Sequence, residues 1–131
     1  MDHRAKLLIV EDEELSQKFY KIFLSKYFDI VICPSAETCE NAIAVNDFDL
    51  ILMDISLSGK KDGLQVTREL RQMDKYKNVP ILALTANVLR RDEEAAMAAG
   101  INLFLKKPLE NTKLLEAINK YLNKKEASSI Q

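Results

Sequence analysis

Five short apolar runs divide the chain, and none of them alternates apolar with polar residues. They are Leu7–Val10, Ile30–Cys33, Leu50–Met53, Ile81–Leu84 and Leu103–Leu105. Continuous apolar runs of this length are typical of strands that are buried on both faces, as in a parallel sheet. The pattern therefore predicts five buried strands.

Between these runs, apolar residues recur at the spacing of an α-helix. The stripes are Leu15, Phe19, Ile22 and Phe23, then Cys39, Ala42 and Ile43, then Leu64, Thr67 and Leu70, and finally Leu115, Ile118 and Leu122. Residues 88–99 are rich in Ala, Arg and Glu, and Gly100 stands where a glycine would end a helix. Asp62 and Gly63 suit the start of the third helix.

Strand and helix thus alternate five times, which indicates an α/β layer fold with a parallel sheet and right-handed crossovers. Among open sheets, the strand order 2-1-3-4-5 suits five strands. We therefore predict a flavodoxin-like (βα)5 fold, an open five-stranded parallel sheet in the order 2-1-3-4-5 with helices on both faces.

Composition narrows the functions that such a fold could carry. A length of 131 residues corresponds to one domain of ~150 residues. Nineteen basic and 20 acidic residues give a net charge of −1, too little for a field that holds nucleic acid or an anionic membrane. Three glycines cannot build a glycine-rich nucleotide loop, and the single histidine, His3, cannot build a multi-histidine metal site.

The sequence predicts one domain with a short tail at each end. We expect a tail at residues 1–5, the domain at 6–123 and a flexible polar tail at 124–131. No apolar run approaches the ~20 residues of a membrane span, and no signal-peptide pattern precedes the first strand. Two cysteines without a CxxC motif fit a reduced, cytoplasmic protein.

Reactive polar residues follow four of the five predicted strands. The residues are Glu11 and Asp12 after the first, Asp54 after the third, Thr85 after the fourth, and Lys106, Lys107 and Pro108 after the fifth. The second strand is followed only by Pro34 and Ser35. Ligands of open α/β sheets bind at the carboxyl ends of the strands, where the strand order reverses. These side chains are therefore expected to share one site.

Such a cluster suits phosphoryl transfer. Three carboxylates, Glu11, Asp12 and Asp54, would repel one another unless a hard cation such as Mg²⁺ joined them. Asp54 could attack phosphorus, since aspartate is a known nucleophile of this kind. Lys107 and Thr85 could then bind the phosphoryl oxygens.

Each residue also has an ordinary structural interpretation. Glu11 and Asp12 could cap the first helix, Thr85 could be a turn residue, and one of the two adjacent lysines is expected to be plain surface. Asp54 is harder to explain in this way. A carboxylate that directly follows a buried apolar strand is costly unless it is paired or functional.

Taken together, the motifs resemble the receiver domains of two-component signalling, from about Lys6 to Leu122. The resemblance rests on Glu11-Asp12 after Leu-Leu-Ile-Val, Asp49 to Asp54, Asp62-Gly63-Leu, Pro80 to Asn87, Ala99-Gly100 and Phe104 to Pro108. It implies a response regulator domain that accepts a phosphoryl group from a histidine kinase or a histidine phosphotransfer protein. It also implies a signalling domain rather than an enzyme, although one that promotes its own Mg²⁺-dependent phosphorylation and slow dephosphorylation.

The resemblance assigns a role to each site residue. Asp54 matches the phosphoacceptor, and Thr85 and Lys107 match the residues that bind the phosphoryl oxygens. Mg²⁺, or Mn²⁺ in its place, would be held by Asp12 directly, by Glu11 through water, by Asp54, and by the backbone carbonyl of Ser56. Further matches are Phe104 as an aromatic switch coupled to Thr85, Ala86 at the donor entrance, Ser56 and Asn87 as residues that tune phosphoryl lifetime, and Lys107-Pro108 as a bond that is often cis.

The chain departs from the family pattern at two places. Glu11 replaces the commoner Asp, and the segment 57–63 is one residue longer than usual, with Ser58 where Pro is common. We expect the output to be a remodelled face formed by the fourth helix, fifth strand and fifth helix, read by a downstream protein. Met1 and the short tail favour a stand-alone protein over a receiver cut from a hybrid kinase.

Three other functions fit parts of the pattern. A pseudo-receiver would dock without phosphorylation, and the intact acidic pair, Asp54 and Lys107 argue against it. A flavodoxin-like cofactor binder needs a hydroxyl- and glycine-rich loop where this chain has four carboxylates at 11–14. A dehalogenase-like phosphatase needs an Asp-x-Asp pattern after its first strand, which this sequence lacks.

Overall fold

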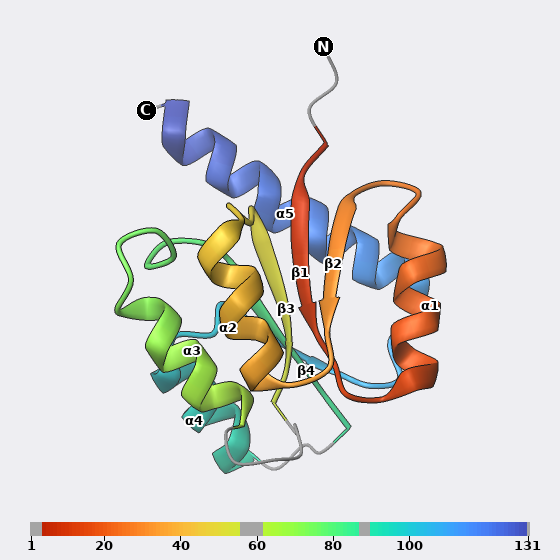
Figure 1. Ribbon diagram of the computed structural model, residues 1–131, viewed down its shortest axis with the longest axis horizontal. Coiled ribbons are helices and arrows are strands. Elements are labelled where there is room, and N and C mark those ends of the chain that lie inside the picture. Colours follow the sequence, from red (N-terminus) through yellow and green to blue (C-terminus); the bar gives the residue numbers. More distant parts are fainter. Residues whose placement is uncertain (1–3, 56–61, 87–89, 131) are drawn as a thin grey trace.

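The computed structural model describes residues 4–55, 62–86 and 90–130, with the backbone alone for residues 90–92 and 124–130. Strand and helix alternate five times along the chain (Figure 1). The elements are β1 (Lys6–Val10), α1 (Glu14–Leu24), β2 (Asp29–Cys33), α2 (Ala36–Val45), β3 (Leu50–Asp54), α3 (Gly63–Arg71), β4 (Ile81–Thr85), α4 (Arg90–Ala99), β5 (Leu103–Lys106) and α5 (Asn111–Ile130). All five predicted strands and all five predicted helices are confirmed.

The strands form one parallel sheet in the order β2-β1-β3-β4-β5, as the sequence predicts. The register aligns their carboxyl ends. Val10 pairs with Met53, Asp54 with Leu84, and Thr85 with Lys106. The residues that follow β1, β3, β4 and β5 therefore lie along the same sheet edge.

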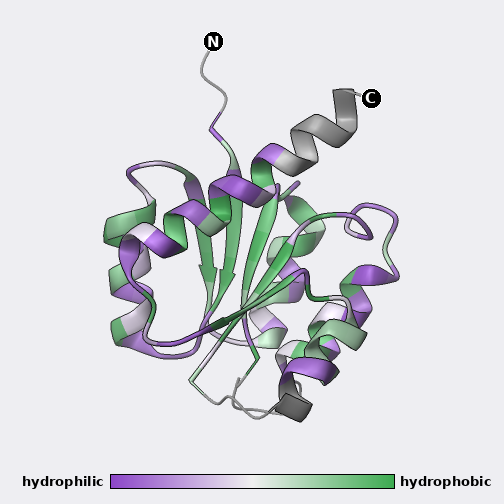
Figure 2. Ribbon diagram, turned by 180° about the vertical axis from the view of Figure 1, so that it is seen from behind, coloured by the Kyte–Doolittle hydropathy of each residue, from purple (hydrophilic) through white to green (hydrophobic). Residues whose placement is uncertain are grey.

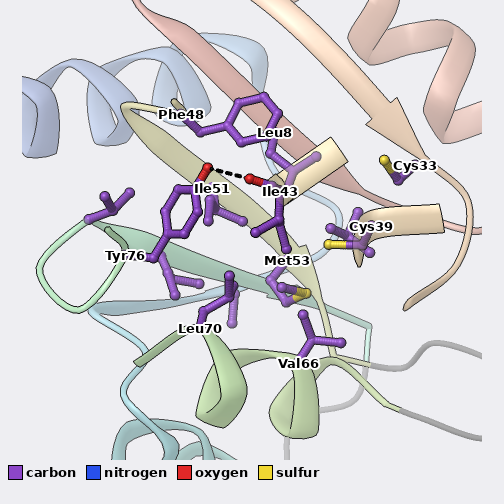
Figure 3. Packing of buried hydrophobic residues seen from close by; sticks show 14 of the residues in the cluster. Leu8, Cys33, Cys39, Ile43, Phe48, Ile51, Met53, Val66, Leu70 and Tyr76 are labelled. Carbon is purple, nitrogen blue, oxygen red and sulfur yellow. Dashed lines mark hydrogen bonds between the residues drawn. The ribbon is translucent and has the colours of Figure 1, made fainter. Parts of the chain in front are cut away.

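Helices cover both faces of the sheet. Buried side chains of α2, α3 and α4 pack on one face, and those of α1 and α5 pack on the other. The strands are apolar almost throughout, whereas the helices carry polar residues on their outer sides (Figure 2). On the first face Tyr76 is fully buried and its hydroxyl donates to the Ile43 carbonyl oxygen over 3.3 Å (Figure 3).

The predicted start of α3 at Asp62 and the predicted end of α4 at Gly100 are confirmed. Asp62 caps α3 by accepting from the backbone N–H of Gln65 at 2.9 Å, and the Gln65 side chain accepts from the Asp62 N–H. Gly100 follows α4 with φ +113°, a backbone conformation that favours glycine. Cys33 and Cys39 are both buried, and burial raises the pKa of the Cys33 thiol.

Two helices differ from the sequence analysis in detail. The backbone of α5 is helical to Ile130, where the sequence suggested a tail from residue 124; no glycine or proline in that segment stops the helix. In α1 the buried residues are Tyr20 and Leu24, whereas the apolar stripe used to predict the helix is largely outside. Within the described part of the chain, no helix has the length and apolar character to cross a membrane.

Candidate functional site

Three carboxylates meet at the carboxyl ends of the adjacent strands β1 and β3. One oxygen each from Glu11, Asp12 and Asp54 lies within 4.8 Å of the others. Glu11 is 1% exposed and Asp54 is 6% exposed, while Asp12 is half-buried. The side chains that the sequence placed in one site are thus brought together by the pairing of β1 with β3.

Asp54 ends the central strand, whose five residues are all buried. Behind it, the first turn of α3 approaches the backbone closely. A Cβ atom on Gly63 would lie 2.5 Å from the Asp54 carbonyl oxygen and 2.8 Å from the Ile55 Cα. Glycine at this position therefore lets α3 pack against the end of the strand that carries Asp54.

Glu11 is held by hydrogen bonds on every side. Its backbone N–H donates to the Cys33 carbonyl at 3.0 Å, and its own carbonyl accepts from the Gln17 Nε2 at 2.6 Å. Its Oε2 accepts from the Glu13 N–H at 3.2 Å. The N-cap residue of α1 is Glu13, whose own side chain makes no cap hydrogen bond. This contact of Gln17 could not be predicted from the sequence, because its spacing of six residues from Glu11 matches no motif.

Lys107 reaches into the cluster from the end of β5. Its Nζ lies 2.7 Å from Glu11 Oε1 and 3.7 Å from Asp54 Oδ2. Its backbone N–H donates to the Thr85 carbonyl at 2.8 Å, which ties the end of β5 to that of β4. The Lys107–Pro108 peptide bond is cis. Of the two adjacent lysines, Lys107 is the one in the cluster, and Lys106 is exposed.

The pKa values of both Glu11 and Lys107 are raised in this cluster. Burial raises the pKa of the Glu11 carboxyl, and the neighbouring Asp54 raises it further, although the Lys107 hydrogen bond acts in the other direction. Burial lowers the pKa of Lys107, but the Glu11 hydrogen bond and the Asp54 charge outweigh this, and its pKa is raised overall. The ammonium is therefore firmly protonated beside the carboxylates.

The remaining predicted residues are distributed around this cluster. Thr85 is 1% exposed at the end of β4, Ala86 is exposed beside it, and Phe104 is half-buried against the core. Ser56, Asn87 and most of the lengthened segment 57–63 lie outside the described residues, as does His3. The metal-facing carbonyl and the lifetime-tuning roles predicted for Ser56 and Asn87 stay predictions.

An apolar groove adjoins the cluster, between α1 and the segment after β5. It has a volume of about 400 Å³, and its lining residues are Ser16, Phe19, Tyr20, Leu84, Ala86, Lys107, Pro108, Leu109 and Leu114. Burial raises the pKa of the Tyr20 hydroxyl in its wall to about 12. The position of Tyr20 in this groove could not be predicted from the sequence, because a tyrosine near apolar residues of a helix looks like ordinary core.

The donor set fits a hard divalent cation. All three groups are carboxylates, and Mg²⁺ prefers oxygen ligands with one or two carboxylates among them. Their oxygens are close enough to share one ion. The strand order reverses between β1 and β3, and the three carboxylates lie at this place. The molecule is therefore an α/β protein with an acidic site, suited to a cation, where ligands of open parallel sheets bind.

The family follows from comparison with known proteins. The family model described as the response regulator receiver domain matches residues 7–119, and the chain belongs to this family. It is 32% identical over 124 residues to the polar-differentiation response regulator DivK of Brucella anthropi, and 34% identical over 118 residues to DivK of Brucella ovis. Each alignment covers 88% of this chain and 94% of the relative.

Solved structures agree with this assignment. The receiver domain of the sensor histidine kinase PA1611 of Pseudomonas aeruginosa, described with a magnesium ion coordinated in its active site cleft, is 30% identical with a TM-score of 0.84. That match covers 92% of this chain and 99% of the other. A CheY-like receiver protein of Methanospirillum hungatei, 21% identical with a TM-score of 0.87 over 96% of this chain and 99% of the other, supports the fold.

Proposed function

We propose that this receiver domain accepts a phosphoryl group on Asp54 from a phosphohistidine of another protein. One observation carries the proposal: the buried Asp54 carboxylate ends the central strand, among two further carboxylates and the Lys107 ammonium. A carboxylate buried at this cost, at the carboxyl end of a central strand, is a candidate nucleophile.

The proposed step needs no oxidant or reductant. An Asp54 carboxylate oxygen attacks phosphorus and forms a P–O bond, while the P–N bond to the donor imidazole breaks and its electron pair stays on nitrogen. Lys107 would bind a phosphoryl oxygen as the charge develops, and Thr85 would bind another through its hydroxyl. The contribution of these residues is positioning and charge, which is what phosphoryl transfer requires.

Glu11, Asp12 and Asp54 are the residues that would hold Mg²⁺, or Mn²⁺ in its place, with the Ser56 carbonyl as a further proposed ligand. When bound, such a cation offsets the negative charge that a phosphoryl group brings to an acidic site. The pairing of β1 with β3 places these three carboxylates next to one another.

The donor we propose is a histidine kinase or a histidine phosphotransfer protein that docks over α1. Leu15, Phe19 and Ile22 lie on one side of this helix and are 76%, 38% and 69% exposed. Apolar patches of this kind mark protein-interaction sites. Phe19 also lines the groove that leads to Lys107, so an apolar surface runs from α1 to the proposed phosphoacceptor site.

For the output we propose a population shift coupled through Thr85 and Phe104. It would remodel the face formed by α4, β5 and α5, where a downstream protein would bind. Support comes from the hydrogen bond between Lys107 N–H and Thr85, which joins the proposed phosphoryl-binding residues to β5.

The test uses a small phosphodonor with Mg²⁺, followed by intact mass measurement and peptide mapping. We expect one added phosphoryl group on Asp54 in the natural sequence, and none in Asp54→Asn. Asp74→Asn, on an exposed aspartate far along the chain, is the matched control and should be labelled normally. An equal yield in Asp54→Asn, or no labelling of the natural sequence, would leave a docking module without phosphorylation as the better reading.

A further inference from the structure

Helix α3 runs from the end of β3 that carries Asp54 to the opposite edge of the sheet. Its first residue, Gly63, packs on the backbone of this strand end, where an added Cβ atom would lie 2.5 Å from the Asp54 carbonyl oxygen. Its last residue, Arg71, contacts the connection that precedes β5, at the amino end of that strand. Nine helical residues make a rod of about 13 Å between the two ends. A displacement of the backbone at Asp54 therefore displaces one end of this rod.

The body of α3 is packed closely against the core. Val66 and Leu70 are 4% and 1% exposed and point from α3 into the same apolar cluster that holds Ala96 of α4 and Ile101 (Figure 3). Protein interiors of this kind have few voids, so a shift of one packed element is transmitted to its neighbours. The helix can therefore pass a displacement from its first turn to its last.

The Arg71 guanidinium uses all five of its N–H groups at the far end of α3. Its Nε and Nη2 donate to the Gly100 carbonyl oxygen at 3.0 and 2.7 Å, and Nη2 also donates to Asn102 Oδ1 at 2.7 Å. Its Nη1 donates to the carbonyl oxygens of Tyr76 and Val79 at 2.9 and 2.7 Å. The connection between α4 and β5 is thus attached to the end of α3 by a planar, rigid group.

Asn102 extends this attachment to β4 and α5. Its Oδ1 also accepts from the Ile81 N–H, and its own N–H donates to the Ile81 carbonyl oxygen, both at 2.8 Å. Its carbonyl oxygen accepts from the Tyr121 hydroxyl of α5 at 3.2 Å. A continuous series of contacts therefore leads from Asp54 through α3 and Arg71 to α5, one of the three elements of the proposed output face.

We propose that α3 is a second route from Asp54 to the α4–β5–α5 face, and that Arg71 is the positioning residue that completes it. This inference rests on the proposed phosphoacceptor function and adds a path for its signal. The path is separate from the one proposed through Thr85 and Phe104, which lie on β4 and β5. The two ends of α3 should then be coupled energetically, and this coupling should require the Arg71 fork.

The first experiment needs no phosphodonor and compares amide NMR spectra. Gly63→Ala adds a Cβ atom that the Asp54 backbone must accommodate, so it displaces the start of α3. We expect the amide resonances of Gly100 and Asn102 to move in response. Arg71→Lys keeps the charge and loses the fork. In that background the same change at residue 63 should move the two resonances less than about half as far.

Two variants serve as controls. Arg68→Lys makes the same replacement at an exposed arginine of α3 and should leave the response to Gly63→Ala complete. Ser35→Ala removes the side-chain cap of α2, on the same face of the sheet, and should leave the Gly100 resonance in place. An unchanged response in Arg71→Lys, or no response to Gly63→Ala, would overturn the proposal.

The second experiment uses phosphorylation itself and does not require the glycine variant. The natural sequence and Arg71→Lys are treated with a small phosphodonor and Mg²⁺, and labelling of Asp54 is measured by intact mass on the NMR samples. We expect equal labelling. The shifts of Asn102 and Tyr121 on phosphorylation should be smaller by at least about half in Arg71→Lys, while the shift of Phe104 persists. Full shifts of Asn102 and Tyr121 in the labelled variant would refute the role of α3.

Failure of this proposal and failure of the function give different results. If Asp54 is labelled and Arg71→Lys responds like the natural sequence, α3 is not a route and the phosphoacceptor function stands. If Asp54 takes no phosphoryl group, the phosphoacceptor function is wrong, whereas the response to Gly63→Ala still decides whether Arg71 links the two ends of α3.

Discussion

Asp54 follows four buried apolar residues of β3 and is itself almost inaccessible to water. A carboxylate in such a place is destabilising unless a cation or hydrogen-bond donors compensate for its lost hydration. Lys107 supplies part of that compensation from 3.7 Å away, and the neighbouring carboxylates act against it. A buried carboxylate at this position agrees with the phosphoacceptor role proposed for Asp54.

Tyr20, in the wall of the adjoining groove, gives a prediction about pH. Its pKa is about 12 in the folded protein against 10.0 for an ordinary tyrosine, because burial disfavours the phenolate. Between these values the unfolded chain loses the proton and the folded chain keeps it. The free energy of unfolding therefore falls as pH rises through this window, by up to about 1.4 kcal/mol per pH unit from this group.

Tyr20→Phe should remove that part of the alkaline loss. Urea unfolding of the natural sequence and of Tyr20→Phe, followed on both sides of pH 10, measures the difference in slope. Tyr27→Phe is the control, since Tyr27 lies just after α1 and is 48% exposed. Parallel pH profiles for the natural sequence and Tyr20→Phe would contradict the prediction.

At the scale of elements, the apolar pattern of α1 predicts the helix but not the side of it that packs on the sheet. The period of its apolar residues correctly predicts a helix, yet Leu15 and Ile22 face outward while Tyr20 and Leu24 pack on the sheet. Helical periodicity does not say which of two apolar sides is covered by the fold. An uncovered side of this kind is what the proposed donor would bind.

Ile22→Ser should therefore slow transfer from a phosphohistidine donor protein and leave labelling by a small phosphodonor unchanged. The residue is 69% exposed, so its replacement leaves the core intact. We expect the apparent KM for the donor protein to rise about tenfold, a typical effect of losing an apolar contact in an interface. Val45→Ser, which is exposed on α2, should have no effect on either donor.

A second element-scale feature joins the end of α3 to the connection between α4 and β5. The Arg71 guanidinium donates to the carbonyl oxygens of Tyr76, Val79 and Gly100 and to the Asn102 side chain, at 2.7–3.0 Å. A Cβ on Gly100 would lie 2.7 Å from the Arg71 Cγ. Glycine is favoured at position 100 for two reasons. Its φ of +113° is a conformation that other residues rarely adopt, and a Cβ atom there would collide with the Arg71 side chain.

Arg71→Met should lower the free energy of unfolding by about 2–4 kcal/mol, because several part-buried carbonyls lose their donor at once. Denaturant unfolding measures this directly. Arg68→Met, an exposed arginine of the same helix, should change stability by less than about 0.5 kcal/mol. Similar losses in the two variants would show that the network does not stabilise the molecule.

At the scale of the whole molecule, the strands were predictable because each apolar run is continuous. The helices were predictable from the apolar stripes between these runs, together with a start signal at Asp62 and a stop signal at Gly100. Strand order then brought Glu11, Asp12, Asp54 and Lys107 to one edge. What the sequence could not provide was the choice of partner within that edge. That Lys107 binds Glu11 more closely than Asp54 depends on side-chain reach, and Gln17, Tyr20 and Arg71 act through contacts that leave no motif.

Coupling across the molecule gives the last prediction. If Asp54 phosphorylation shifts a conformational equilibrium through Thr85, NMR shifts on phosphorylation should extend from the cluster to Phe104 and the α4–β5–α5 face. A ligand shifts such an equilibrium only by its different affinity for the two states. The hydroxyl of Thr85, 1% exposed at the end of β4, is the group proposed to sense the phosphoryl oxygens.

Thr85→Val keeps the size of this buried side chain and removes its hydroxyl. The variant should still take up a phosphoryl group on Asp54, more slowly, while the shifts at Phe104 and along β5 shrink by at least half. That separation is the decisive measurement, because a loss of phosphorylation alone would affect the cluster and the distant face together. Shifts confined to the cluster in the natural sequence would show that the α4–β5–α5 face does not respond, and the output would have to be sought on another surface.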